Sequence, residues 1–124
     1  MKIGDYVRFE FFRISVPIHI SKIIDINYDE QENINLYGTE DGFILTDNNI
    51  IKSSPDLEDV LEKDDFITTK DGKIVQIYNI EDDKIYFFYD GLDYIYPYYI
   101  KSIVTKEQFE AIKYEIKWNM ETNT

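Results

Sequence analysis

Hydrophobic residues occur along the chain in short runs that are separated by polar or glycine-containing turns. Runs of this length, rich in Ile, Tyr and Phe, are typical of β-strands. The separators Lys70-Asp71-Gly72 and Asp90-Gly91 have the chemistry of tight turns. Short strands at close spacing predict a sandwich or small barrel. The predicted strands cover residues 5–13, 18–27, 33–37, 42–46, 50–52, 65–69, 73–80, 84–89 and 94–104.

The strand pattern repeats within the chain. Segments of the first half match segments of the second half in the same order, with offsets that fall from 60 to 51 to 49 residues. The falling offset predicts an insertion of about ten residues at Phe9–Pro17 of the first copy. It also predicts that Ile23 and Ile74 hold equivalent core positions. The predicted organisation is a first copy at 1–61, a second copy at 62–118 and a flexible tail at 119–124.

Two short helices are predicted, one after the last strand of each copy. Ser54 is a favourable N-cap and Pro55 a favourable first position, with acidic residues in the first turn. Thr105 and Gln108 have capping-box spacing. The apolar residues expected to face inward are Leu57, Val60 and Leu61 in the first helix, and Phe109, Ile112 and Ile116 in the second.

The opening segments of the two copies point to a particular barrel. Gly4-Asp5-Tyr6-Val7-Arg8 and Asp64-Asp65-Phe66-Ile67 each lead from a turn into an apolar strand, as SH3-like barrels often do. The predicted fold is therefore mainly β, with two tandem SH3-like small barrels that arose by duplication and a short helix after each. A fold of this kind says little about function.

Composition and charge exclude several classes of protein. The 124 residues carry 13 basic and 25 acidic side chains, a net charge of −12, so we expect no direct binding to nucleic acid or to an anionic membrane. The chain has no cysteine, which excludes disulfides, thiolate zinc sites and a cysteine nucleophile. No segment predicts a membrane span or a signal peptide.

Enzyme chemistry finds no support in the residue pattern. His19 is the only histidine, and a lone histidine in a strand is usually structural. No zinc spacing, P-loop, dinucleotide motif or nucleophile elbow is present. The carboxylates at predicted turns are expected to be solvated surface, and none forms a calcium-loop pattern. We expect no catalytic residue, no metal and no cofactor.

The junction between the copies is the most acidic stretch of the chain. It is expected either to be a solvated linker or to present a row of carboxylates to a basic protein groove in place of phosphates. Replacing Asp56, Asp59, Asp64 and Asp65 together is then expected to leave the fold intact. The candidate partner-binding acids are Asp56, Glu58, Asp59, Glu62, Asp64 and Asp65.

Tyrosines near the C-terminal end form a second candidate surface. Tyr94, Tyr96 and Tyr98 alternate along the chain, so an extended strand would place them on one face. Pro97 cannot donate a ladder hydrogen bond and places this strand at an edge or a bulge. The tyrosines are expected either to be half-buried packing or to form a protein-binding surface.

Three segments resemble one group of proteins: Met1–Arg8, Ile51–Pro55 and Ile100–Glu110. They look like uncharacterised small acidic proteins from phages and prophages of Gram-positive bacteria. That group has no assigned activity or catalytic residues, so no role transfers to individual positions. The resemblance implies a small viral accessory protein in bacterial cytoplasm.

Together these features predict a phage-encoded binding protein rather than an enzyme. The leading hypothesis is an inhibitor of the anti-CRISPR or anti-restriction type. Its partner would be a host protein whose basic surface binds nucleic acid, which the carboxylates would mimic. The alternative is a structural or adaptor module that binds another phage protein, with acidity serving only solubility. The pattern leaves a homodimer open.

Overall fold

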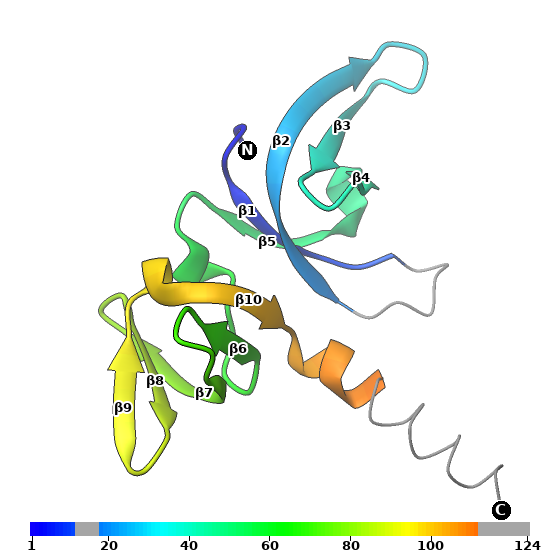
Figure 1. Cartoon of the computed structure of the whole chain (residues 1–124). Coiled ribbons are helices and arrows are strands. Elements are labelled where there is room, and N and C mark those ends of the chain that lie inside the picture. Colours follow the sequence, from blue (N-terminus) through cyan, green and yellow to red (C-terminus); the bar gives the residue numbers. More distant parts are fainter. Residues whose placement is uncertain (12–17, 112–124) are drawn as a thin grey trace, which may run out of the picture.

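The computed structural model describes residues 1–11 and 18–111, which form two five-stranded antiparallel sheets in succession along the chain (Figure 1). The first barrel contains β1 (Tyr6–Phe9), β2 (His19–Asp29), β3 (Ile34–Thr39), β4 (Ile44–Leu45), the 3-10 turn η1 (Asp47–Asn49) and β5 (Ile50–Ser54). The 3-10 turn η2 (Leu57–Asp59) follows. The second barrel contains β6 (Phe66–Thr69), β7 (Ile74–Glu81), β8 (Lys84–Phe88), β9 (Leu92–Ile95), η3 (Pro97–Tyr99) and β10 (Ile100–Val104). Residues 106–111 are helical.

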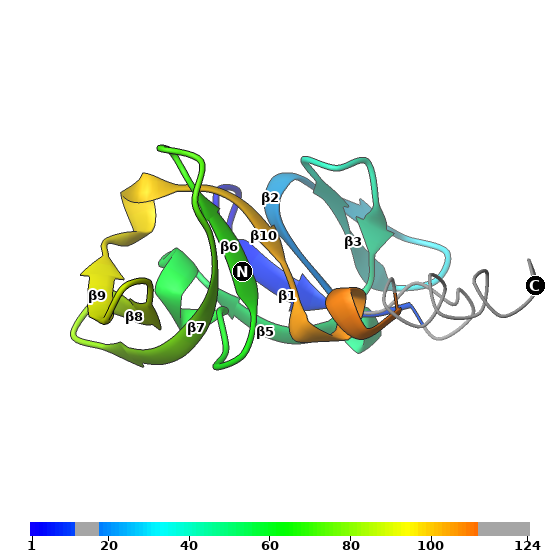
Figure 2. The same ribbon diagram turned by 60° about the horizontal axis from the view of Figure 1, so that its bottom comes forward.

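Both sheets have the same topology, as the duplication predicts. The strand order is β4-β3-β2-β1-β5 in the first barrel and β9-β8-β7-β6-β10 in the second. In each, four consecutive strands form a meander, and a 3-10 turn then leads to a fifth strand that pairs with the first. This is the connectivity of an SH3-like barrel. Figure 2 shows the two barrels side by side.

The predicted alignment of the copies is wrong by three residues in their second strands. The amide of Gly4 donates to the carbonyl of Ile23 at 2.8 Å, and the amide of Asp64 donates to that of Ile77 at 2.9 Å. Ile77, not Ile74, is therefore the counterpart of Ile23. Burial agrees, because Ile77 is 1% exposed whereas Ile74 is 71% exposed.

The shift arises because the extra residues of the first copy lie in two places. Ile26 pairs with Tyr37 and Ile80 with Ile85, so the β2–β3 hairpin is six residues longer than its counterpart. The connection from β1 to β2 is also longer than that from β6 to β7. Of the insertion predicted at residues 9–17, residues 12–17 lie outside the described part of the chain.

Two predicted elements differ in the structure. The strand predicted at 94–104 is divided into β9, η3 and β10, because Pro97 occupies the first turn of η3 and favours that conformation over a continued ladder. The helix predicted after Ser54 is only the single turn η2, since so short a segment gains too few hydrogen bonds to nucleate an α-helix. The capping box at Thr105 forms as predicted, with its hydroxyl accepting from the amide of Gln108 at 3.1 Å.

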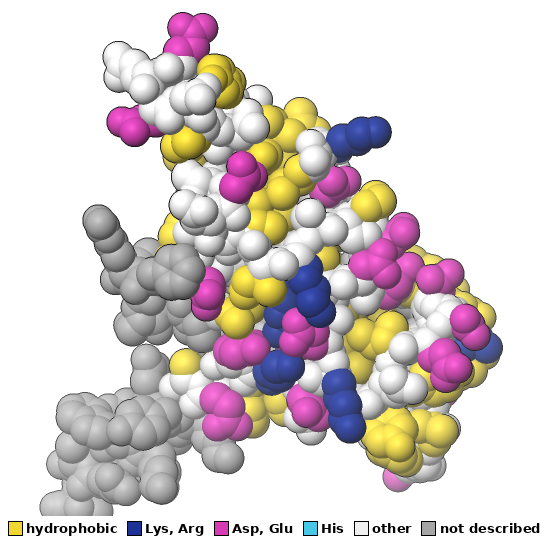
Figure 3. Space-filling view, turned by 180° about the vertical axis from the view of Figure 1, so that it is seen from behind, with side chains coloured by type: hydrophobic (Ala, Val, Ile, Leu, Met, Phe, Trp, Pro, Cys, Tyr) yellow, Lys and Arg dark blue, Asp and Glu magenta, His cyan; other side chains and the backbone are white. Residues whose placement is uncertain are grey.

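The two barrels pack directly against each other. The Thr105 hydroxyl donates to the Ile18 carbonyl at 2.6 Å, and the side chains of Gln108 and His19 meet at 2.9 Å. Ile20 of β2 contacts the core of the second barrel. Basic and acidic side chains lie next to each other where the barrels meet (Figure 3).

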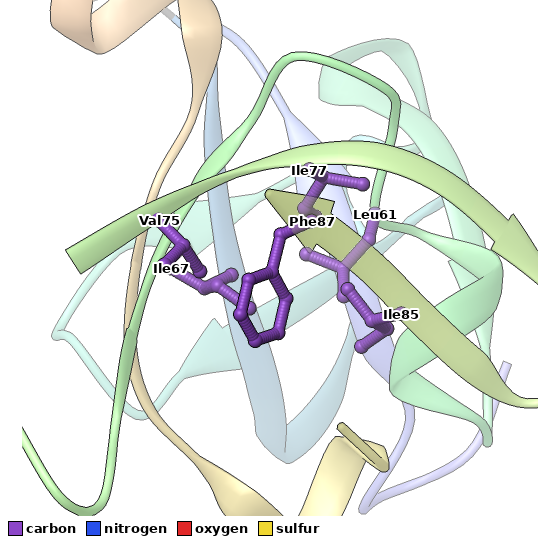
Figure 4. Packing of buried hydrophobic residues seen from close by; sticks show 6 residues of the cluster. All are labelled: Leu61, Ile67, Val75, Ile77, Ile85 and Phe87. Carbon is purple, nitrogen blue, oxygen red and sulfur yellow. The ribbon is translucent and has the colours of Figure 1, made fainter. Parts of the chain in front are cut away.

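Each barrel has its own hydrophobic core. The core of the second barrel comprises Leu61, Ile67, Val75, Ile77, Ile85 and Phe87 (Figure 4). The first core comprises Val7, Phe9, Ile23, Tyr37 and Leu45. Leu61 lies between η2 and β6, and its side chain packs in the second core. No helix among the described residues is long and apolar enough to cross a membrane.

Candidate functional site: an aromatic face on the second barrel

The outer surface of the second barrel carries a continuous set of large apolar side chains, which we call the aromatic face. It is built on β7, β8, β9 and η3. Six of its seven members expose between 38% and 71% of their surface to solvent, and Tyr86 is half-buried. Its members are Tyr78, Tyr86, Phe88, Leu92, Tyr94, Tyr96 and Tyr98.

The strand register places these side chains together. Tyr86 lies opposite Tyr94, and Phe88 lies opposite Leu92, and residues directly opposite in an antiparallel pair share a face. The rings of Tyr78 and Phe88 meet at 4.9 Å between centroids. The predicted row of Tyr94, Tyr96 and Tyr98 forms, with centroid separations of 5.8 and 5.9 Å.

Tyr94 lies in β9, which is an edge strand of the second sheet, as the position of Pro97 predicts. Ile95 points away from the tyrosines into the second core. Tyr94 is 42% and Tyr98 is 71% exposed. The row therefore lies at the surface, with Tyr98 as its most exposed member.

The first barrel provides an internal comparison, because it has the same fold without an aromatic face. We aligned the two barrels by their hairpin registers and their 3-10 turns η1 and η3. Each member of the aromatic face then has a counterpart in the first barrel. None of these counterparts is aromatic, so an SH3-like barrel of this design does not require the rings for folding. The counterparts, in the same order, are Ile24, Gly38, Glu40, Gly42, Ile44, Thr46 and Asn48.

The acidic junction does not form one surface, and this corrects the prediction of a carboxylate row. Asp65 is fully buried and accepts two hydrogen bonds from the guanidinium of Arg8, at 2.7 and 3.1 Å. It also accepts from the amides of Glu62 and Lys106, at 2.8 and 3.0 Å. Asp65 therefore joins the barrels and cannot contact a partner. Its replacement would not leave the fold intact.

Glu62 belongs to the same ion cluster. Its carboxylate lies 2.8 Å from the ammonium of Lys106, 3.0 Å from that of Lys52 and 3.4 Å from Nε of Arg8. The hydrogen bond from Lys106 is the main reason why the pKa of Glu62 falls to about 2. Arg8 also reaches Glu107 at 2.9 Å. Burial alone would lower the pKa of Arg8, but Asp65 and its acidic neighbours outweigh burial and raise it.

Acid is expected to weaken this cluster. Because the pKa of Glu62 is about 2 in the folded protein and 4.5 ordinarily, its contribution to stability is complete above pH 4.5 and is lost as the pH falls toward 2. Allowing for solvent screening, the expected loss is about 1–2 kcal/mol. Urea unfolding of wild type and Glu62→Gln at several pH values measures it. Equal losses in both proteins over this range would show that Glu62 does not contribute.

The other four junction acids lie at the surface, in two places. Asp56 and Asp59 are exposed on η2, and Asp59 accepts from the Ser54 hydroxyl at 2.7 Å. Glu58 is half-buried next to Asp83; burial first, and then the neighbouring acids, raise the pKa of Glu58. Asp64 stands apart in the turn before β6. The structure thus brings together only Asp56, Glu58 and Asp59.

The turn η2 comes close to the Tyr98 end of the aromatic face. Leu57 of η2 lines a groove of about 530 Å³ between the barrels together with Pro97 and Tyr98. Asp83 precedes Lys84, whose ammonium lies 4.8 Å from the centroid of the Tyr94 ring. The charged side chains that line the groove with Tyr98 are two acids and two lysines: Glu40, Asp41, Lys22 and Lys101.

His19 contacts the aromatic core of the first barrel and the helical segment 106–111. Its ring stacks on Phe9 at 5.8 Å and its Nδ1 lies 2.9 Å from the side-chain nitrogen of Gln108. Burial lowers the pKa of His19, so the neutral ring accepts the amide hydrogen of Gln108. No group of metal-ligating side chains is found among the described residues.

The face includes four residues that the pattern of alternating tyrosines does not predict: Tyr78, Tyr86, Phe88 and Leu92. The signal was present, because a tight turn at Asp90-Gly91 sets the pairing of Phe88 with Leu92 and of Tyr86 with Tyr94. The role of Arg8 is not predicted either. A charged residue inside the apolar strand Tyr6–Phe9 must be paired if it is buried.

Comparison of the chain with protein-family models, curated proteins and solved structures gave no match.

Proposed function

We propose that this protein is a non-enzymatic binding protein whose aromatic face docks on the nucleic-acid-binding surface of a partner protein. The observation that carries the proposal is the aromatic face itself. The second barrel has it and the first lacks it, although both share one topology. Large exposed apolar patches mark interaction sites, and tyrosine is enriched where interfaces hold their binding energy.

The net charge supports a basic partner. The chain carries 25 acidic and 13 basic side chains, and Leu57, the residue between Asp56 and Glu58, lines the same groove as Tyr98. An excess of carboxylates complements a Lys/Arg-rich surface and accelerates association with it. Such surfaces commonly bind nucleic acid.

The resemblance to phage proteins supports a host defence protein as the partner. Binding would inhibit that protein by occupying the surface where its nucleic acid binds, as expected of an anti-CRISPR or anti-restriction protein. Glu62 and Asp65 belong to the internal ion cluster. Fewer carboxylates are therefore available to mimic nucleic acid than the sequence predicts. The aromatic face therefore supplies the affinity in this proposal, and the charges supply steering.

A second candidate function is an adaptor that binds another phage protein. The same internal use of Glu62 and Asp65 favours it, because fewer carboxylates remain for mimicry. In an adaptor the aromatic face would dock on a partner that binds no nucleic acid, and the net charge would only maintain solubility.

Capture from a nuclease-treated bacterial lysate tests the proposal. The immobilised wild type is expected to retain a nucleic-acid-binding protein, and the Tyr94→Ala, Tyr98→Ala variant is expected to lose it. The matched control is Ile24→Ala, Ile44→Ala, which removes exposed side chains at two counterpart positions of the first barrel. Retention of the same protein by both variants would refute a role for the aromatic face. Retention of a protein that binds no nucleic acid would favour the adaptor.

A further inference from the structure

His19 and Gln108 connect the start of β2 to the helical segment 106–111, and the capping box of Thr105 fixes the orientation of the Gln108 side chain. Oε1 of Gln108 accepts from the backbone N–H of Thr105 at 2.9 Å, and the Thr105 hydroxyl accepts from the backbone N–H of Gln108 at 3.1 Å. Turning the side-chain amide over would place its NH₂ group against the Thr105 N–H, donor against donor. The NH₂ group of Gln108 therefore faces Nδ1 of His19, 2.9 Å away.

This orientation requires a neutral His19. An imidazole ring accepts a hydrogen bond at Nδ1 only when its single hydrogen is on Nε2, whereas both nitrogens of the charged ring are donors. Nε2 of His19 is buried and has no hydrogen-bond partner among the described residues. A charged ring would therefore direct one N–H at the NH₂ group of Gln108 and would leave the other buried without an acceptor.

The surroundings of His19 do not compensate a positive charge on the ring. The ring lies 5.8 Å from Phe9 and 5.5 Å from Phe43, between centroids. Among the described residues, Asp41 alone favours the charged form, and burial outweighs it and lowers the pKa of His19. Arg8, Lys106 and Glu107 belong to the ion cluster. The remaining charged side chains of the elements around the ring are Glu10, Lys22, Glu40 and Glu110.

We propose that the His19–Gln108 contact is an acid-sensitive contact between the two barrels, which forms while His19 is neutral and breaks when His19 binds a proton. This property does not depend on the identity of a partner protein. The contact adjoins the hydrogen bond from the Thr105 hydroxyl to the Ile18 carbonyl, at 2.6 Å. Arg8 and Asp65 still join the barrels when it breaks, so acid loosens only this end of the interface.

The direction of the pKa shift defines the pH range of the effect. The ordinary pKa of histidine is 6.5, and that of His19 is lowered in the folded protein. The contribution of the contact to stability is therefore complete above pH 6.5 and is lost as the pH falls from 6.5 through the lowered pKa. Glu62 titrates outside this range, because its pKa is about 2.

NMR titration between about pH 7.5 and about pH 5 tests the inference. His19 is the only histidine, so its ring resonances report its pKa directly, which should lie below 6.5. Hydrogen-exchange protection factors of the Gln108 and Phe109 amides report the contact, and should fall at least about threefold as the ring is protonated. The amide of Ile77, which donates to the Asp65 carbonyl at 2.8 Å within the second barrel, should keep its protection.

Gln108→Glu is the most informative variant. Its carboxylate can accept from the Thr105 N–H and from the charged ring together, so it should raise the pKa of His19 and keep the helical segment protected in acid. His19→Phe keeps an aromatic ring next to Phe9 and Phe43 and should abolish the pH dependence of protection. The matched control is Glu62→Gln, which removes a carboxylate of the ion cluster and should leave that pH dependence unchanged.

Three results would overturn the inference. The first is constant protection of the Gln108 and Phe109 amides while His19 titrates, and the second is a pH dependence that persists in His19→Phe. The third is a pKa of His19 that Gln108→Glu does not raise. This last measurement decides the question even if His19→Phe does not fold.

Discussion

Replacing Arg8 with alanine is expected to lower the free energy of unfolding by about 3–5 kcal/mol. The side chain is 1% exposed and gives two hydrogen bonds to Asp65, which is fully buried, and one to Glu107. Alanine would leave the Asp65 carboxylate buried with only two amides as donors. Breaking a buried pair by removing one partner is costly because the remaining charge is uncompensated.

Urea unfolding near neutral pH measures this loss. Lys52→Ala is the matched control, because it also removes a cation from Glu62 but from an ion pair whose lysine is 44% exposed, so a loss below about 1 kcal/mol is expected. Adding Asp65→Asn to Arg8→Ala should recover part of the stability, since a neutral amide is cheaper to bury than an unpaired carboxylate. A loss from Arg8→Ala as small as that from Lys52→Ala would contradict the structure of the cluster.

The second large effect is expected on binding. Against the captured partner, the Tyr94→Ala, Tyr98→Ala variant should lose at least about 100-fold in affinity, mainly through faster dissociation, because buried aromatic anchors each contribute about 2 kcal/mol or more. Its stability should change by no more than about 1 kcal/mol, since both rings lie at the surface, with Tyr94 42% and Tyr98 71% exposed. Surface plasmon resonance and urea unfolding measure the two quantities.

A variant without three surface carboxylates distinguishes the effect of charge on association from the effect of the tyrosines on dissociation. Asp56→Asn, Glu58→Gln, Asp59→Asn removes the acids of η2 without touching Asp65, and should slow association and flatten its dependence on salt. Dissociation should change little. If this variant associates at the wild-type rate at low salt while the tyrosine variant still fails to bind, the carboxylates serve solubility and the adaptor becomes the better account.

Much of the fold could be predicted from the sequence, because its strongest signals are local. The turns Lys70-Asp71-Gly72 and Asp90-Gly91 divide the strands, and the topology follows from two copies of one pattern. The alignment of the copies was less accurate, since Ile-rich strands match one another at several registers. In the sequence, both Ile74 and Ile77 can be aligned with Ile23. The backbone hydrogen bonds of Gly4 and Asp64 identify Ile77 as the counterpart.

The candidate site was predicted in part. The tyrosine row could be predicted because alternating residues of a strand lie on one face and Pro97 indicates an edge strand. Both signals are visible in the sequence. Which acids of the junction are exposed and which are buried depends on contacts between residues far apart in the chain. Asp65 is separated from Arg8 by 57 positions and is buried by it, and Asp64, its neighbour, remains exposed. A run of carboxylates has the same appearance in sequence whether its members face solvent or an arginine.

Competition between this protein and duplex DNA for the captured partner shows whether the aromatic face occupies the nucleic-acid-binding surface. The partner is held at fixed concentration in about 0.15 M salt, and binding of the wild-type protein is titrated at increasing DNA concentrations. If the aromatic face occupies the nucleic-acid-binding surface, the apparent Kd will rise in proportion to DNA and no ternary complex will form. An unchanged Kd with a ternary complex of protein, partner and DNA would contradict the proposed function.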